Sequence, residues 1–507
     1  MQVRVEPVTV TEIATPLLVV NLFDGVELPG GATGAVDQAM GGLVGRLAAR
    51  RELNTDLGQV TVIYNMGQFS DLSAERVAVV GLGKQADFDL EAARVAGAAA
   101  ARKARDLKLE RYATVIHGAG IGGLDVADAT QAVVEASHLA LFTLTDFKSA
   151  PEKPVTEVFE LTIVERDPER AERMRGPAEV GTACAEATMI TRRLSSSPSN
   201  VCTPEYLANR AREVCDQHGH EISIYGKEEL ERMGFGGVLA VNQGSVLQPR
   251  FVVMRYSSPR ATKTLAVVGK GITFDTGGIS IKPAEGMEWM RHDMSGAAAT
   301  IGFMDLMGRL KPDVNVIGLF AATDNMPSGA AYKPGDVIKA YNGKMMDILN
   351  TDAEGRVTLA DVLAYAVEQK PNVIVDMATL TGACVVALGY FASGVFGNDD
   401  ALIEQMRRAG DKSGERVWPL PLWPVYHKQI ESPLGDIKNT GGRPAGSITA
   451  AAFLQNFVAD VPWLHLDIAG TAYSTGDKSW IPPYQNKSES TGVGVRLLYH
   501  FLRIWNN

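Results

Sequence analysis

Four acidic residues lie where predicted strands end or predicted helices begin. They are Asp275, in a glycine-rich segment after a strand, Asp293, directly before a helix of small residues, and Asp352 and Glu354, which alternate. Residues two apart in an extended segment point to the same side, so Asp352 and Glu354 are expected to face one space. Four carboxylates at one place cannot all stay ionised without cations. The pattern therefore predicts two divalent metal ions about 3.5–4 Å apart, with a metal-bound water as the nucleophile.

Three basic residues accompany these carboxylates in the sequence. Lys270 precedes Asp275 in the same segment, and Lys282 ends the glycine-rich loop. Arg356 alternates with Glu354, so its guanidinium is expected to face the same space as Asp352 and Glu354. A lysine beside two metal ions is easily deprotonated and can then serve as a ligand. A Lys or Arg that keeps its charge there would instead stabilise an oxyanion. The residues alone leave both roles open for the two lysines.

Other candidate residues have ordinary structural explanations. His292 and His465 lack HExxH or a comparable spacing, and His465 lies in an apolar strand, where a hydrogen-bonded core histidine is expected. Gly118–Gly123 follows a strand and loosely resembles a phosphate-binding loop, but a single glycine cluster favours a tight turn. The chain has no Walker A motif and no GxSxG elbow, so the sequence does not support an NTPase or a serine hydrolase.

Short apolar segments alternate with helical segments along the whole chain. In its larger, second part we expect strands at 251–255, 264–268, 314–322, 373–377 and 463–468, with helices at 295–310, 357–368 and 449–458. This alternation predicts an α/β fold whose sheet is mostly parallel and covered by helices on both faces. Ligands of such sheets bind just beyond the carboxyl ends of the strands, where the acidic residues lie.

The chain of 507 residues is long enough for two or three domains of ordinary size. A charge-dense segment at 165–175 and a long amphipathic helix, which ends in a turn cluster at 195–200, indicate a boundary. We expect a smaller N-terminal α/β domain over 1–165, a linker helix over 166–199, and a larger catalytic α/β/α domain over 200–507.

Composition argues against several classes of partner. The 49 Lys and Arg residues against 59 Asp and Glu give a net charge of −10, which disfavours a nucleic-acid or anionic-membrane binder. No apolar run approaches the roughly 18 residues of a membrane span, and the start of the chain has no signal-peptide pattern. Only 4 cysteines occur, and none form a CxxC pair. We therefore expect a cytoplasmic protein without disulfides or a membrane partner.

Residues 350–356, Asn-Thr-Asp-Ala-Glu-Gly-Arg, resemble the signature of the leucine aminopeptidase family, the two-metal cytosol aminopeptidases. Further segments in the family's order support the resemblance, at 269–275, 290–293, 447–454 and 465–470. The resemblance covers about 200–507, whereas 1–165 carries no comparable motif. It implies an enzyme that releases N-terminal amino acids from peptides by a two-metal hydroxide mechanism, with leucine and similar residues preferred.

The resemblance also implies a role for each matching residue. Lys270, Asp275, Asp293 and Glu354 would hold one metal ion, and Asp275, Asp352 and Glu354 the other, the ions being Mn²⁺ or Zn²⁺. Lys282 would polarise the scissile carbonyl, and Arg356 would hold a bicarbonate ion that acts as general base. The substrate would be bound by Met290, Asn350, Thr379, Leu380 and Gly382. Tyr473, where many relatives have Trp, is a mild departure that bears on local packing or substrate preference.

Beyond peptide substrates, the resemblance implies self-association as a homohexamer, a dimer of trimers with the active sites facing an interior cavity. Two alternatives to the peptidase stay open. One is a DNA-binding regulator, since some relatives have that second role, although the net charge of −10 argues against it. The other is a catalytically silent structural homologue, against which the intact set of ligand residues argues.

Overall fold

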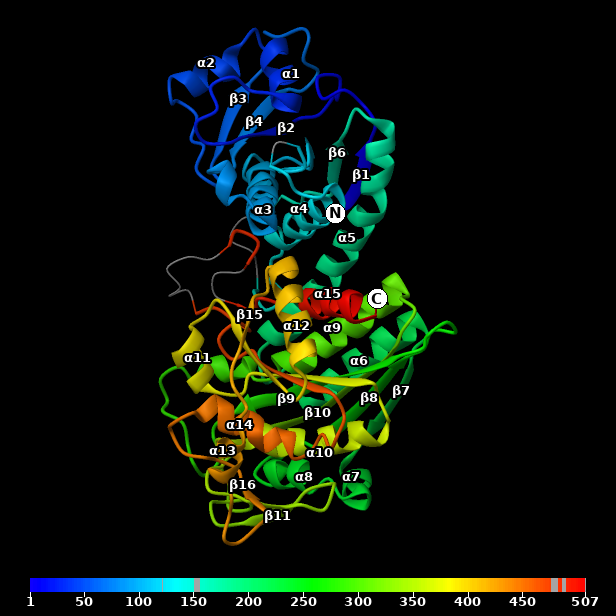
Figure 1. Cartoon of the computed structure of the whole chain (residues 1–507), viewed down its shortest axis with the longest axis vertical. Helices are drawn as coiled ribbons and strands as arrows, with labels where there is room; N and C mark the ends of the chain where they lie inside the picture. The colour runs from blue at the N-terminus through cyan, green and yellow to red at the C-terminus, as the bar shows by residue number, and fades with distance from the viewer. Residues whose placement is uncertain (121, 150–155, 476–481, 486–488, 507) are drawn as a thin grey trace. The chain divides into compact units, whose positions relative to one another are not determined.

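The computed structural model describes residues 1–120, 122–149, 156–475, 482–485 and 489–506 (Figure 1). These residues form two compact units. The first consists of described residues from 1–186 and 479–486, and the second of those from 187–478 and 487–507. Helix α5 (Pro168–Ser196) contains the sequence position at which the chain passes from the first unit to the second. Within the described ranges, no helix combines the length and the apolar character that a membrane crossing requires.

The first unit is built on a six-stranded sheet with the order β1-β6-β5-β2-β4-β3. The strands are β1 (Gln2–Glu6), β2 (Leu18–Leu22), β3 (Val60–Tyr64), β4 (Arg76–Gly81), β5 (Arg111–Thr114) and β6 (Glu160–Val164). All neighbouring strands are parallel except β3 and β4. The helices between them are α1 (Gly31–Ala39), α2 (Leu43–Ala49), α3 (Leu90–Asp106) and α4 (Val126–Ala140), with a short 3₁₀ segment η1 (Gln85–Asp87).

Successive side chains along each strand point to opposite faces, so this sheet has a hydrophobic core on each face. Val19 of β2 belongs to the core that includes α3 and α4, whereas Leu18 and Val20 belong to the core that includes α1 and α2. Strands buried on both faces need apolar residues at successive positions, which explains the continuous apolar runs in this part of the sequence.

The second unit is built on an eight-stranded sheet with the order β15-β14-β17-β13-β9-β10-β8-β7. The strands are β7 (Glu221–Tyr225), β8 (Arg250–Tyr256), β9 (Thr264–Asp275), β10 (Asn315–Asn325), β13 (Val373–Ala378), β14 (Ser393–Gly397), β15 (Val417–Pro419) and β17 (Trp463–Asp467). The central strands β17, β13, β9 and β10 are parallel, as are β14 and β15. A separate small sheet contains β11 (Val337–Lys339), β12 (Met345–Asp347) and β16 (Ile437–Lys438).

Helices cover both faces of the eight-stranded sheet (Figure 1). One face carries α6 (Pro204–His218), α9 (Ser295–Leu310), α12 (Asp400–Ser413) and α15 (Val495–Asn506), and the other carries α8 (Gly236–Asn242), α10 (Glu354–Glu368) and α14 (Gly446–Gln455). Shorter segments are α7 (Lys227–Met233), η2 (Met287–His292), α11 (Gly382–Leu388) and α13 (Pro424–Lys428). The predicted α/β fold, with two domains and a mostly parallel sheet in the larger one, is confirmed.

Two glycines allow α9 to pack directly on the centre of this sheet. A Cβ on Gly269 of β9 would lie 2.4 Å from the carbonyl oxygen of Gly296 in α9. A Cβ on Gly296 would lie 2.1 Å from the carbonyl oxygen of Met377 in β13. No real Cβ tolerates such distances, so both positions need glycine. The short contact brings the beginning of α9, and with it Asp293, close to the end of β9.

We predict that Gly269→Ala lowers the free energy of unfolding by about 1–3 kcal/mol, because the added methyl group must displace the backbone of α9. Chemical denaturation of the full chain, followed by circular dichroism, measures the change. Gly329→Ala is the matched control, since a Cβ there meets nothing within 4 Å. We expect it to alter stability by no more than about 0.5 kcal/mol. Equal stability of both variants would contradict the role assigned to the contact between β9 and α9.

Candidate functional site

A cavity of about 380 Å³ lies at the carboxyl end of the eight-stranded sheet. Its walls come from residues that follow β9, β13 and β17, from η2, and from the beginnings of α10 and α11. Ligands of open α/β sheets bind at this edge, because loops from several parallel strands converge there. The position of the cavity therefore agrees with the expectation from the order of the strands.

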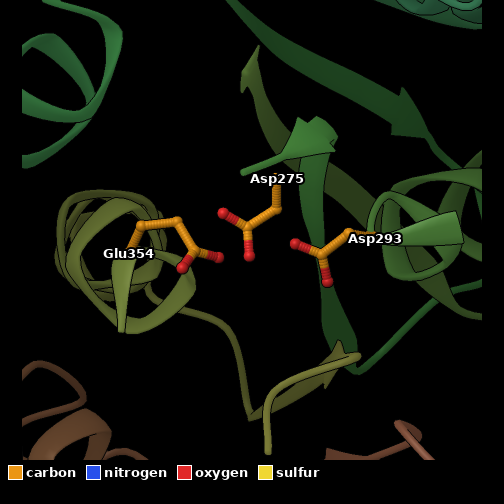
Figure 2. Close-up of side chains that lie close together, drawn as sticks. All are labelled: Asp275, Asp293 and Glu354. Carbon is orange, nitrogen blue, oxygen red and sulfur yellow. The ribbon is translucent and has the colours of Figure 1, made fainter. Parts of the chain in front are cut away.

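Three buried carboxylates, from here on the acidic group, meet in this cavity (Figure 2). Asp275 is the last residue of β9, Asp293 precedes α9, and Glu354 is the first residue of α10. One oxygen of each lies within 4.8 Å of the others. Figure 2 shows the three side chains pointing toward one another from different elements. The arrangement can hold a cation between residues that are far apart in the sequence.

Two lysines lie against these carboxylates. The Nζ of Lys270 lies 2.8 Å from Asp293 Oδ2 and 2.8 Å from Glu354 Oε1. The Nζ of Lys282 lies 2.7 Å from Asp275 Oδ2 and also contacts Oδ1 of Asp352, which brings a fourth carboxylate into the site. With all six groups ionised, two positive and four negative charges leave a formal charge of −2.

The pKa values reflect this excess of negative charge. Burial raises the pKa of Asp275 to about 6, and Glu354 adds to the shift. Burial also raises the pKa of Asp293 well above its usual range. Burial alone would raise the pKa of Glu354 too, but Lys270 and Lys282 outweigh it and lower the value. Within the chain itself the site therefore favours proton uptake, which bound cations would oppose.

The residues present fit divalent metal ions. Three buried carboxylate oxygens, Asp293 Oδ2, Asp352 Oδ1 and Glu354 Oε1, make no hydrogen bond among the described residues, but each lies against a lysine ammonium. Carboxylates are the ligands that ions such as Mn²⁺ prefer, and such ions would compensate the negative charge that the two lysines leave. The donor set and its charge thus suit the metal centre that the sequence predicted.

Lys270 reaches the acidic group by passing the first turn of α10. A Cβ on Gly355 would lie 2.4 Å from the Cε of Lys270, so a larger residue there would force the lysine chain to shift. The Nζ of Lys270 also donates a hydrogen bond to the carbonyl oxygen of Thr379, at 3.0 Å. These contacts hold the amine between Asp293 and Glu354.

Two polar residues hold carboxylates of the acidic group by hydrogen bonds, and neither contact was predicted from the sequence. Asn325, at the end of β10, donates from Nδ2 to Asp275 Oδ1 at 2.8 Å and to the carbonyl oxygen of Thr351 at 3.0 Å. Thr379 was predicted to bind substrate, and its hydroxyl also donates to Asp293 Oδ1 at 2.6 Å. Asn325 follows a strand of the same sheet, so the rule that identified Asp275 could also have found it.

Asp467, at the end of β17, holds the loop after β13. Its carboxylate accepts hydrogen bonds from the Leu380 amide at 3.2 Å and from the Thr381 hydroxyl at 2.5 Å. Burial raises the pKa of Asp467, and these donors oppose the shift. The loop that it holds is the one predicted to bind substrate. No signal in the sequence alone paired Asp467 with that loop.

The predicted site residues fall into two sets. Those that line the cavity are Lys270, Asp275, Lys282, Met290, Asp293, Asp352, Glu354, Thr379, Leu380 and Gly382. Asn350 and Arg356 do not line it. The side-chain oxygen of Asn350 instead accepts a hydrogen bond from the backbone amide of Asp352, at 2.9 Å. Arg356 is buried and donates from Nη1 to the carbonyl oxygen of Asn439 at 2.9 Å.

The conformation predicted for residues 352–356 is wrong. Asp352, Glu354 and Arg356 were expected to share a side of an extended segment, but α10 begins at Glu354. Residues two apart in a helix point about 200° away from each other, so Glu354 and Arg356 do not share a side of the segment. Burial lowers the pKa of Arg356, and the charges of Glu354 and Asp352 still oppose that shift, so the guanidinium remains in the electrostatic field of the site. Glu354 nevertheless faces the cavity because the first turn of α10 points toward it. An acidic residue in the first turn of a helix is itself a stabilising feature.

His292 and His465 are not part of the acidic group. His465 is buried in β17, with Nδ1 2.6 Å from Oδ1 of Asp376, which confirms the prediction of a hydrogen-bonded core histidine. His292 is stacked on Tyr473, with ring centroids 4.7 Å apart, and Trp289 lies 5.9 Å from each of these rings. These aromatic side chains form one wall of the cavity. Tyr473 therefore bears on the shape of the site.

Models of known protein families match the sequence of both units. The family model described as "Cytosol aminopeptidase family, catalytic domain" matches residues 189–499. The model described as "Cytosol aminopeptidase family, N-terminal domain" matches residues 19–151. The two models match in the order in which the units occur in the chain.

Individual proteins match over nearly the whole chain. A "Probable cytosol aminopeptidase" of Roseiflexus castenholzii is 44% identical over 97% of this chain and 97% of its own length. Another of Geobacter sulfurreducens is 42% identical over 99% of each. Among solved structures, "Bottromycin maturation enzyme BotP in complex with Mn" has a TM-score of 0.84 and 32% identity, covering 97% of this chain and 100% of that one. Agreement of both domains with one family, over almost the entire length, identifies this protein as a member of the cytosol aminopeptidase family.

Proposed function

We propose that this peptidase is a two-metal aminopeptidase that releases N-terminal amino acids, with leucine and similar residues preferred. The observation that carries the proposal is the buried acidic group with Asp352, whose negative charge the two lysines compensate only in part. Membership of an aminopeptidase family supports the peptide substrate. The similar bottromycin maturation enzyme forms a complex with Mn, which supports a divalent metal. When bound, two divalent ions would polarise the scissile carbonyl and lower the pKa of water to give a nucleophile.

We assign the ligands as the family resemblance implied. Lys270, Asp275, Asp293 and Glu354 would hold one ion, and Asp275, Asp352 and Glu354 the other, with Asp275 and Glu354 bridging. Mn²⁺ and Zn²⁺ both suit such a set. Lys270 can be a ligand only as a neutral amine. Burial would lower its pKa, but the neighbouring carboxylates raise it instead, so the charge of bound ions is needed to favour the neutral form.

The remaining residues would bind and orient the peptide. Lys282 lies at the cavity wall with its Nζ near Asp275, where it could donate a hydrogen bond to the scissile carbonyl oxygen as negative charge develops there. Met290, Thr379, Leu380 and Gly382 would line the substrate subsites. Asn350 would act indirectly, through its hydrogen bond with the Asp352 amide.

We also propose that Arg356 holds a bicarbonate ion as general base. Its guanidinium is buried, and its Nε has no hydrogen-bond partner among the described residues. A buried donor of this kind is satisfied by an anion.

We further propose a cytoplasmic homohexamer, which the name of the relatives and the family resemblance suggest. Large apolar side chains are exposed on neighbouring parts of the second unit, among them Tyr390, Phe391, Trp418 and Trp423. Exposed aromatic residues in such number favour an interface between copies. Sedimentation velocity of the purified chain should give the mass of six subunits, and a monomer at micromolar concentration would contradict this proposal.

We predict that Glu354→Gln abolishes cleavage of leucyl-amide and lowers the metal content of the purified protein, because a neutral amide cannot bridge two cations. The wild-type protein, loaded with Mn²⁺ or Zn²⁺, should cleave this substrate and contain two metal ions per chain by elemental analysis. Glu368→Gln, at the exposed end of the same helix, is the control and should keep both properties.

Two outcomes would argue against this assignment. Full turnover with two metal ions in the Glu354→Gln protein would exclude Glu354 as a bridging ligand. Equal cleavage of leucyl-amide and of its N-acetylated form by the wild-type protein would exclude an enzyme that requires a free amino terminus. A wild-type protein that holds metals but cleaves neither substrate would favour the catalytically silent homologue.

We predict that Lys282→Ala lowers kcat by about 10²–10³-fold and leaves the metal content unchanged, because the lost ammonium stabilises charge only during the reaction. Steady-state kinetics on leucyl-amide together with elemental analysis measure both quantities. Lys282→Arg keeps the positive charge and should retain part of the activity. Loss of a metal ion from Lys282→Ala would instead make this lysine a ligand.

A further inference from the structure

The first unit contains a second cavity, of about 350 Å³, which the peptidase chemistry does not use. It is lined by residues that follow β1, β2, β5 and β6 of the six-stranded sheet, and by the beginnings of α1 and α5. All of these strands are parallel, so the cavity lies at the carboxyl edge of the sheet. Its volume is sufficient for a small organic ligand.

The order of the strands makes this edge a topological switch point. β2 and β5 are neighbours in the sheet. The chain leaves β2 toward β3 and β4 on one side, and it leaves β5 toward β6 and β1 on the other. The loops after β2 and β5 therefore diverge and leave a crevice between them. Open α/β sheets bind nucleotides and related ligands in this crevice.

Glycine-rich backbone forms the walls of the crevice on both sides. Gly30 is the N-cap residue and Gly31 the first residue of α1 after β2, and Gly30 has no side chain with which to cap the first turn. By contrast, Asp125 caps α4 by accepting from two backbone amides. The uncapped start of α1 leaves amide hydrogens and a positive helix end for an anion. On the opposite side, Gly120 lines the cavity, and a Cβ there would meet nothing within 4 Å.

Residues 118–120 and 122–124 combine a turn with this open position. The amide of Leu124 donates to the carbonyl oxygen of Gly118 at 3.1 Å. A Cβ on Gly122 would lie 2.7 Å from the Cα of Gly118, so the turn itself needs glycine. The tight turn expected from the sequence is thus present, and it carries Gly120 at the edge of the cavity.

Arginine side chains supply positive charge at the same edge. Arg170, in the first turn of α5, lines the cavity and donates a hydrogen bond to the carbonyl oxygen of Ala119. Its Nε lies 3.3 Å from Glu165, and Arg166 is a further cationic residue of the lining. Two arginines and one glutamate give this wall a formal charge of +1. A guanidinium can bind phosphate oxygens in pairs, which suits a phosphorylated ligand.

Much of the remaining lining is apolar, with polar side chains such as Asn21 and Thr33 among it. Phe23, Val26, Ile116 and Met174 provide the apolar surface. Asn21 also lines the cavity, and its Nδ2 lies 3.1 Å from Nδ1 of the buried His117. Such a surface accommodates a flat ring, and a side-chain amide can pair with the polar edge of that ring.

We propose that this cavity binds a nucleotide, with its phosphates against the start of α1 and Arg170 and its base in the apolar part. The proposal rests on the switch-point cavity, the uncapped helix and the arginines together. It does not depend on the proposed mechanism of the peptidase site, because all lining residues belong to the first unit.

Isothermal titration of the full chain with ADP, AMP, adenosine and inorganic pyrophosphate tests the proposal. We expect ADP to bind with one site per chain, and adenosine and pyrophosphate each to bind at least tenfold more weakly. Arg170→Ala should weaken ADP binding at least tenfold, whereas Arg173→Ala, on the same helix but outside the lining, should not. Ala32→Phe, which adds bulk to the lining at α1, should remove binding.

Two controls separate this cavity from the metal centre and from misfolding. ADP should bind equally well to the Glu354→Gln protein, and the Arg170→Ala and Ala32→Phe proteins should cleave leucyl-amide like the wild type. Absence of ADP binding at millimolar concentration would overturn the proposal. So would ADP binding that Glu354→Gln abolishes, binding that neither cavity variant affects, or adenosine or pyrophosphate binding as tightly as ADP.

Discussion

Mutual repulsion among four carboxylates, only partly opposed by two lysines, is the interaction on which the second unit depends. Three of these carboxylates are buried, whereas the Asp352 side chain is 33% exposed, so the buried ones would turn toward solvent if their backbone allowed it. Asn325 and Thr379 prevent this, because each donates a short hydrogen bond to one carboxylate of the acidic group. Asp467 holds the adjoining loop in the same way. The fold thus maintains an unfavourable charge arrangement, and divalent cations would turn it into a favourable one.

The positions of these carboxylates depend on backbone packing more than on the carboxylates themselves. Asp275 lies at the end of a central parallel strand, where the ladder with β10 holds it in register. Asp293 is held by the start of α9, which reaches the sheet only because Gly269 and Gly296 lack side chains. Three segments far apart in the sequence therefore meet with little freedom. Such rigidity suits a reaction in which misplacement of a reacting atom by about 1 Å costs much of the rate.

The sequence allowed prediction of the α/β fold, and most of the predicted site residues line the cavity, because both follow from where strands end. The orientation of Arg356 was predicted incorrectly because Glu354 was interpreted as part of an extended segment. Acidic residues are common in the first turn of a helix, where Glu354 lies. Asp467 and Asn325 were missed because their partners are distant in the chain. The cavity of the first unit was missed for the same reason. Gly118–Gly123 alone indicates only a turn, and its significance depends on Gly30 and Arg170, which meet it only in three dimensions.

The contact between Gly355 and Lys270 links two motifs that appear independent in the sequence. Since a Cβ at 355 would overlap the lysine chain, neither position can change freely while the other stays the same. A larger residue at 355 would displace the lysine chain from its present position unless Lys270 were also replaced by a shorter residue. That second change would remove the amine from the acidic group. Gly355 and Lys270 are therefore expected to change together, and a relative without this glycine should also lack the lysine amine at its acidic group.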